Sequence, residues 1–192
     1  MIAIVKYNAG NIRSVQNALS RLGYESIITD DKDDIRKAGK VIFPGVGEAG
    51  SAMKYLKERE LDKLILSLKQ PVLGICLGLQ LMCRFSEEGD VECLKIFDSA
   101  VRMFPKADKV PHMGWNNFMS VDGDLFKGIS PINDVYFVHS YYAEICSDTT
   151  AICDYILPFS AAMKKGNYYA TQFHPEKSAT VGDHILRNFL EL

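Results

Sequence analysis

Residues 71–80 read Pro-Val-Leu-Gly-Ile-Cys-Leu-Gly-Leu-Gln. The mostly apolar residues 71–75 have the length and bulk of a buried strand, and residues 77–85 (LGLQLMCRF) are typical of an apolar helix. Cys76 therefore lies at a predicted strand-to-helix turn, with Gly74 two residues before it and Gly78 two residues after it. This spacing is typical of a sharp turn, a nucleophile elbow, which exposes a reactive side chain because glycine lets neighbouring backbone pack closely.

The predicted position of Cys76 also favours reactivity. A thiol at the start of a helix lies near free backbone N–H groups and the positive end of the helix dipole, which favour the thiolate. The N–H of Leu77 is then placed to help hold an oxyanion. An ordinary buried cysteine is the commonest alternative in an apolar run, but the paired glycines favour the catalytic interpretation.

The stretch before the elbow predicts parallel strands. Apolar strands are expected at residues 2–7, 24–29 and 40–43, separated by a helix over residues 11–22 and a charged helix that begins at Asp30 and Asp31. This β-α-β-α-β order predicts right-handed crossover connections. The sequence therefore predicts an α/β fold: an open, mostly parallel mixed sheet with helices on both faces and a nucleophile elbow.

A second glycine motif follows the third predicted strand. Residues 44–47 read Pro-Gly-Val-Gly, and such a loop can present backbone N–H groups to an anion or oxyanion. Alone, this motif usually marks a simple turn. Because it and Cys76 both lie at the carboxyl ends of strands, where open α/β sheets place their sites, we expect them to be neighbours.

The rest of the chain is expected to complete the sheet. Helical patterns cover residues 48–68, and a final helix covers residues 178–192. Between them, residues 86–173 contain short strand-like pieces, which we interpret as the remaining, partly antiparallel strands of the same sheet. These pieces are residues 92–97, 100–104, 134–145, 149–156 and 167–173.

A candidate acid/base pair lies near the end of the chain. If residues 168–176 are extended, His174 and Glu176 project from the same face, with Pro175 stiffening the backbone between them. The imidazole can take the thiol proton and later protonate a leaving nitrogen, while the carboxylate fixes the tautomer. A lone histidine is usually structural, but His-x-Glu together with a glycine-flanked cysteine favours nucleophilic catalysis.

Composition narrows the class of protein. With 192 residues and 47% hydrophobic content, the chain can bury a sizeable core as a single domain, residues 1–192. A formal net charge of −2 gives no electrostatic reason to expect nucleic acid or an anionic membrane as a partner. No apolar run approaches the roughly 20 residues of a membrane span, and residues 1–7 lack the basic stretch and long apolar core that are typical of a secretory signal. We therefore expect a cytoplasmic protein.

The cysteines predict neither a disulfide framework nor a metal site. They are an odd number with no Cys-x-x-Cys pair, and His112 and His184 have no carboxylate or cysteine at ligand-like spacing. We expect no metal and no cofactor, and we expect Cys83 to fill the core. The five cysteines are Cys76, Cys83, Cys93, Cys146 and Cys153.

Several motifs carry a family resemblance. GICLGLQ, PGVG and FHPEKS, in these positions, resemble the class I, triad-type glutamine amidotransferases over nearly the whole chain. VPHMGWN at residues 110–116, FVHSYY at residues 137–142 and the N-terminal YNAGN-x-RSV narrow the resemblance to the glutaminase subunits of imidazole glycerol phosphate synthases, enzymes of histidine biosynthesis.

The resemblance implies an activity and its residues. It implies hydrolysis of L-glutamine to glutamate and ammonia, with Cys76 as nucleophile, His174 as acid/base and Glu176 as its orienter. It also implies a heterodimer with a (β/α)₈-barrel cyclase subunit, which receives the ammonia through its barrel. The implied oxyanion hole is formed by Gly45, Val46, Gly47 and Leu77, and the implied glutamine contacts are Gln80, His139, Ser140 and Tyr141.

Alternatives remain open on the residues alone. A paralogous glutaminase subunit that feeds a different synthase, such as one that amidates surface sugars, would keep the same residues. A cysteine peptidase-like hydrolase would share Cys76 and His174 but act on another substrate, and a non-catalytic subunit would keep only the fold. His139 has the features of a structural histidine, and Met113 and Trp115 those of core or partner contacts.

Overall fold

The N-terminal strands pair in parallel, as the sequence predicts. The computed structural model describes residues 1–192. β1 (Ile2–Val5) pairs with β2 (Ser26–Thr29) on one side and with β3 (Lys40–Gly45) on the other, and β3 pairs with β4 (Val72–Cys76). All three pairings are parallel, so β3 and β4 end side by side with Gly45 opposite Cys76.

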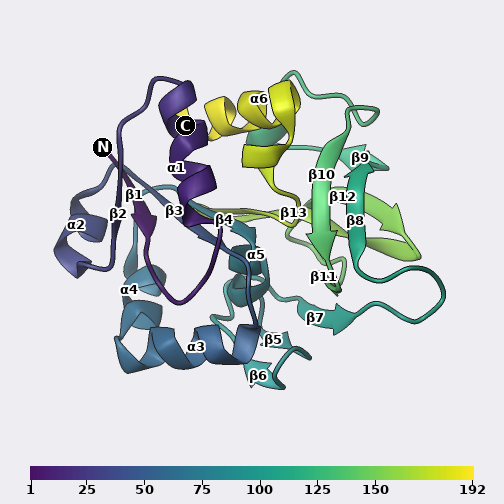
Figure 1. Cartoon of the computed structure of the whole chain (residues 1–192), viewed down its shortest axis with the longest axis horizontal. Helices are drawn as coiled ribbons and strands as arrows, with labels where there is room; N and C mark the ends of the chain where they lie inside the picture. The colour runs from purple at the N-terminus through teal and green to yellow at the C-terminus, as the bar shows by residue number, and fades with distance from the viewer.

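The main sheet continues with strands from the end of the chain. Its eight strands follow the order β2-β1-β3-β4-β14-β13-β12-β9 (Figure 1). β14 (Tyr168–Thr171) is parallel to β4, which brings the segment that leads to His174 beside the elbow. The last three strands are antiparallel: β13 (Leu157–Lys165), β12 (Thr149–Tyr155) and β9 (Ser120–Val121).

Six short strands form two further sheets, so the prediction that every remaining strand joins the main sheet is wrong. β10 pairs with β8, and the other small sheet has the order β11-β7-β5-β6. Their bounds are β5 Phe85–Ser86, β6 Val91–Glu92, β7 Ala100–Met103, β8 His112–Asn116, β10 Val135–His139 and β11 Tyr141–Ala143.

The predicted single strand over residues 134–145 is divided at Ser140. Val135 and Phe137 on β10 pack into one hydrophobic core, whereas Ala143 on β11 packs into the other. The chain therefore changes sheet at Ser140, because the apolar residues on its two sides serve different cores.

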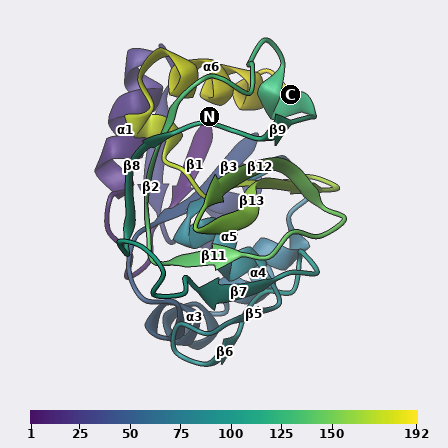
Figure 2. The ribbon, with the colours of Figure 1, turned by 90° about the vertical axis from the view of Figure 1, so that its right-hand side faces the viewer.

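Helices cover both faces of the main sheet, as predicted. Adjacent residues of a strand point to opposite faces, and accordingly Val41 and Phe43 belong to one core while Ile42 belongs to the other. Figure 2 shows the α1 and α6 layer on one side and α3 and α4 on the other. The helices are α1 Ile12–Arg21, α2 Lys32–Lys37, α3 Ala49–Glu58, α4 Leu61–Ser67, α5 Leu77–Met82 and α6 Ala179–Leu190, with 3₁₀ turns η1 Asp124–Phe126 and η2 Pro175–Lys177.

Three other predictions of local structure need correction. Residues 48–68 form two helices, because Glu60 adopts a left-handed conformation (φ 55°) between them. The helix after Cys76 ends at Met82, and the carbonyls of residues 81–83 accept N–H groups from residues 94–97. The strand predicted over residues 92–97 is therefore mostly irregular.

No helix combines the length and apolar character needed to cross a membrane.

Candidate active site

The elbow at Cys76 has a strained backbone. Cys76 ends β4 and precedes α5, with φ 54° and ψ −105°, a region that residues with a Cβ rarely adopt. The turn needs glycine at both flanking positions because other backbone atoms lie too close for a Cβ. A Cβ on Gly78 would lie 1.9 Å from the Phe43 carbonyl oxygen, and a Cβ on Gly74 would lie 2.9 Å from the carbonyl carbon of Gly78. The glycine spacing therefore predicted the local geometry correctly.

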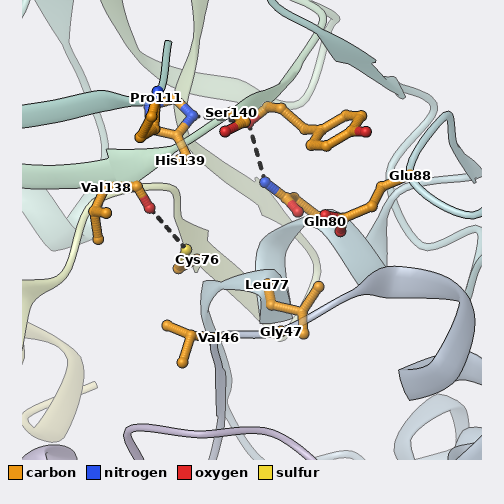
Figure 3. A pocket seen from close by; sticks show the side chains of 11 residues that line it. Val46, Gly47, Cys76, Leu77, Gln80, Glu88, Pro111, Val138, His139 and Ser140 are labelled. Carbon is orange, nitrogen blue, oxygen red and sulfur yellow. Dashed lines mark hydrogen bonds between the residues drawn. The ribbon is translucent and has the colours of Figure 1, made fainter.

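A cavity of about 290 Å³ opens beside the Cys76 thiol (Figure 3). It brings together residues from β4, α5, the segment after β3 and the β10–β11 junction, which are far apart in the sequence. Most of the site residues expected from the sequence line it: Val46, Gly47, Cys76, Leu77, Gln80, His139, Ser140 and Tyr141. The lining residues that sequence reasoning missed are Glu88, Pro111 and Val138.

The Pro-Gly-Val-Gly segment contributes only part of the expected oxyanion hole. The Val46 carbonyl accepts a hydrogen bond from the Gly10 N–H at 2.9 Å. Because a trans peptide points its C=O and N–H in opposite directions, the Gly47 N–H is directed away from Gly10. Gly47 and Leu77 both line the cavity, so their N–H groups are the candidate oxyanion donors.

Gly45 does not line the cavity, which corrects its expected role as part of the oxyanion hole. It belongs to β3, and a Cβ there would lie 2.1 Å from the Tyr7 hydroxyl oxygen. Its lack of a side chain therefore allows Tyr7 to pack under the segment that leads to Val46 and Gly47.

His174 and Glu176 form a buried pair, although not through an extended strand. β14 ends at Thr171, and Glu176 lies in the 3₁₀ turn η2. The turn is held by the Lys177 N–H and the Ser178 hydroxyl, which both donate to the His174 carbonyl, at 3.0 and 2.6 Å. It curls Glu176 back to the imidazole, so that Nδ1 of His174 lies 2.8 Å from Oε1 of Glu176.

The Glu176 carboxylate fixes the His174 tautomer. Since an ionised carboxylate only accepts hydrogen bonds, His174 Nδ1 carries a proton. The Asn11 amide donates to the same oxygen of Glu176, so the first turn of the chain supports the orienting group. His174 Nε2 is buried and makes no hydrogen bond of its own, which leaves it free for proton transfer.

The environment of His174 favours its charged form. Burial lowers the pKa of His174, but the Cys76 thiolate and the Glu176 carboxylate outweigh this effect and raise the pKa to about 10. His174 therefore favours the charged imidazolium, which places a proton donor beside the Cys76 sulfur.

The charge on Glu176 can be tested through stability. Because the folded-state pKa of His174 lies above the reference value of 6.5, its charged pairing stabilises the fold fully below pH 6.5, and this is lost as the pH rises through about 10. Glu176→Gln is expected to lower the free energy of unfolding by about 2 kcal/mol just below pH 6.5. The difference from the wild type should shrink towards pH 10, as measured by urea unfolding.

Glu60→Gln provides the control for this experiment. Glu60 forms exposed ion pairs with Lys32 and Lys63, which solvent screens. Its substitution should have little effect at any pH in the series. A constant deficit for Glu176→Gln across the series would contradict the charged pair.

His139 lines the cavity but is a neutral, structural histidine. Its Nδ1–H donates to the Tyr141 carbonyl at 2.7 Å, so its Nε2 accepts from Nδ1 of His112, 3.0 Å away. Burial lowers the pKa of His139 to about 3 and the pKa of His112 to about 4. His139 therefore shapes the substrate wall near Tyr141 and does not act as a second base.

Glu88 is a site residue that the sequence did not reveal. Its carboxylate lines the cavity and accepts the Ala49 N–H at 3.0 Å at the start of α3. Burial raises the pKa of Glu88, partly opposed by that hydrogen bond. Glu88 lies in the charged loop SEEGD, where nothing distinguishes it from an exposed acid. Its position places a carboxyl group on the cavity wall.

The fold and the site together define the class of protein. It is an α/β protein whose elbow cysteine, histidine and carboxylate are suited to acyl transfer through a thioester. The family model described as "Glutamine amidotransferase class-I" matches residues 3–192. The chain therefore belongs to the class-I glutamine amidotransferases.

Curated relatives narrow the family. The chain is 60% identical to the imidazole glycerol phosphate synthase subunit HisH of Bacteroides fragilis strain YCH46, over 100% of this chain and 99% of that protein. It is 44% identical to the subunit of the same name from Vibrio cholerae, over 100% and 98%. These relatives confirm the resemblance of the sequence motifs to the glutaminase subunits of this synthase.

Solved structures agree on the fold. PurLQS from Thermotoga maritima has a TM-score of 0.74 at 16% identity, covering 99% of this chain and 97% of that one. The glutaminase domain of the Trypanosoma brucei CTPS, solved with bound acivicin, has a TM-score of 0.67 at 18% identity, covering 99% and 93%. The predicted fold class is thus confirmed.

Proposed function

We propose that this chain is the glutaminase subunit of an imidazole glycerol phosphate synthase, acting in the cytoplasm in histidine biosynthesis. It hydrolyses L-glutamine to glutamate and ammonia and passes the ammonia to a cyclase subunit. The observation that carries the proposal is the cavity at the Cys76 elbow, backed by the His174–Glu176 pair, in a chain 60% identical to named HisH subunits over its full length.

The first half of the reaction forms a thioester. The Cys76 thiolate attacks the side-chain amide carbon of glutamine, and the Gly47 and Leu77 N–H groups hold the oxyanion. His174 donates its Nε2 proton to the departing ammonia, which leaves a γ-glutamyl thioester. One oxyanion donor contributes about 100- to 1,000-fold in rate, and acid/base help contributes about 100- to 10,000-fold.

The second half regenerates the thiolate. His174, now neutral at Nε2, takes a proton from water as the water attacks the thioester carbonyl, and a second oxyanion forms at the same donors. Collapse releases glutamate and returns the imidazolium–thiolate pair. Throughout, Glu176 holds the Nδ1–H of the ring and stabilises the charged imidazole.

Charge in the cavity suits an α-amino acid. The Glu88 carboxylate complements the α-ammonium group of glutamine, and Gln80, Ser140 and Tyr141 provide polar contacts on the same wall. Gln80 uses its amide N–H groups on the Tyr141 carbonyl, at 3.1 Å, and on Gln172, at 3.2 Å. Its carbonyl oxygen is therefore the atom available to the substrate.

The proposed partner is a (β/α)₈-barrel cyclase that forms a heterodimer with this chain. Met113 and Trp115 on β8 are 59% and 55% exposed, so the alternative that they fill the core is wrong. Between them and the cavity, His112 on β8 pairs with His139 on β10. An exposed methionine and tryptophan next to the active-site strands are suitable contacts for that subunit.

The test is ammonia release from glutamine, measured for the chain alone and then with a cognate cyclase subunit and its ribonucleotide substrate. Strong stimulation by that pair is the expected result. Activity that is indifferent to the cyclase would indicate a paralogue that feeds another synthase. Cleavage of peptide substrates in preference to glutamine would replace the proposal with a peptidase-like activity.

A further inference from the structure

Gln172 is a buried polar residue in contact with the nucleophile, and neither half of the reaction described so far uses it. Its side chain is fully buried, one residue beyond the end of β14. Its Nε2 lies 3.6 Å from the Cys76 sulfur, and its Oε1 lies 3.2 Å from Nε2 of Gln80. Its backbone N–H donates to the Ala161 carbonyl at 2.8 Å, which fixes the start of the side chain.

The orientation of the Gln172 amide follows from its neighbours. The Tyr141 carbonyl can only accept, so the Gln80 atom facing it, at 3.1 Å, must be the NH₂ group. The same NH₂ group faces Gln172, which must therefore present its oxygen to Gln80. The NH₂ group of Gln172 is left to point at the Cys76 sulfur, where it acts as a donor.

Two groups near the Cys76 sulfur favour opposite protonation states. The Val138 carbonyl lies 3.9 Å away and can only accept, so it favours the protonated thiol. Gln172 can only donate from its NH₂ group, so it favours the thiolate, and hydrogen bonds to charged acceptors are about twice as strong as neutral ones. Gln172 is thus the neutral side-chain donor that offsets Val138.

We propose that Gln172 is a catalytic residue, whose amide N–H stabilises the Cys76 thiolate and whose oxygen holds Gln80 in its substrate-binding orientation. This proposal rests on the proposed glutaminase function and deepens it. It makes Gln172 the link between the wall that binds glutamine and the atom that attacks it.

Two substitutions separate the two roles. Gln172→Glu keeps the shape and the acceptor for Gln80 but places an oxygen against the sulfur. It is expected to lower kcat by about 10- to 100-fold with little change in KM, since a hydrogen bond to a charged group is lost. Gln172→Met fills the same space without polar atoms, so it is expected to lower kcat and also to raise KM.

Thiol alkylation provides a readout that a merely structural role would not move. The rate at which iodoacetamide modifies Cys76 is followed against pH by mass spectrometry of the Cys76 peptide. The midpoint of this profile is expected to move up by about one pH unit in both variants, which corresponds to about tenfold in thiolate population.

Thr171→Val is the matched control. Thr171 is equally buried, precedes Gln172 and donates its hydroxyl to the Phe173 carbonyl at 3.1 Å, so its hydrogen bond is not directed at Cys76. It should lower the melting temperature and leave the alkylation profile in place. An unmoved profile in Gln172→Glu, or an equal shift in Thr171→Val, would overturn the role of Gln172.

The two proposals fail in different ways. A wild-type chain that does not hydrolyse glutamine, with or without the cyclase, sinks the proposed function, while the alkylation profiles still decide whether Gln172 supports the thiolate. An active wild type with unaffected Gln172 variants removes Gln172 alone.

Discussion

Cys76→Ala is expected to abolish ammonia release from glutamine while the protein stays folded. The sulfur of Cys76 is the only sulfur atom that lines the cavity, so only Cys76 can form the thioester, and loss of a nucleophile of this kind costs about a million-fold in kcat. The proposed oxyanion donors and the proposed glutamine contacts remain, so the variant should still bind glutamine. Ammonia release and glutamine binding by calorimetry, measured on the same preparation, test both expectations.

A second cysteine provides the control. Cys83→Ala removes a fully buried thiol from the other core, where burial raises the pKa of Cys83 well above its usual value. It should keep activity and lose about 1 kcal/mol of stability. Full activity in Cys76→Ala would remove Cys76 from its role, and inactivity of a folded Cys83→Ala would show that the loss of activity is not specific to Cys76.

Cys76→Gly separates backbone strain from chemistry. Both it and Cys76→Ala lack the sulfur, but only alanine keeps a Cβ at φ 54° and ψ −105°. Relief of that strain should make the glycine variant about 1 kcal/mol more stable than the alanine variant, with both inactive. Equal unfolding free energies in urea would show that the elbow stores no strain.

The elbow could be predicted from the sequence because glycine reports on backbone proximity directly. At Gly74 and Gly78 only hydrogen fits, and that constraint is local enough to show as a spacing around Cys76. The parallel N-terminal half was predictable for a similar reason, since its apolar strands and amphipathic helices alternate within short windows.

Contacts made by turns and by distant segments could not be predicted in this way. The sequence predicted that Glu176 and His174 pair because they lie on one face of an extended strand. In the structure they pair because a 3₁₀ turn brings Glu176 back to the imidazole. β13 was missed because its central residues are buried on both faces and rich in alanine, so no alternation appears. Glu88 and Gln172 enter the site only through the fold.

The N-terminal turn shows how the site depends on the whole chain. Gly10 donates to the Val46 carbonyl beside the oxyanion segment, and the adjacent Asn11 donates to Glu176. Two consecutive residues therefore support both the proposed oxyanion hole and the proposed triad. Asn11 itself has φ 68°, a conformation that asparagine tolerates better than most residues.

Gly78→Ala is expected to be severely destabilising, although it adds only one methyl group. Its Cβ would lie 1.9 Å from the Phe43 carbonyl oxygen, which is backbone and cannot rotate away. α5 and β3 must separate, at a cost above about 3 kcal/mol. Because β3 leads into Val46 and Gly47, activity should fall by more than the loss of stability explains. Urea unfolding and ammonia release measure the two effects.

Gly39→Ala adds the same methyl group where there is room. Its Cβ would lie 3.8 Å from the Met1 carbonyl oxygen, an ordinary contact, so stability should change by less than about 0.5 kcal/mol. If Gly78→Ala were equally mild, the close packing of α5 on β3 would be wrong, and with it the reason that Cys76, Gly47 and Leu77 meet at one cavity. A large loss confined to Gly78→Ala would instead show that the close approach of Gly78 to Phe43 positions both the nucleophile and the backbone N–H groups proposed to hold the oxyanion.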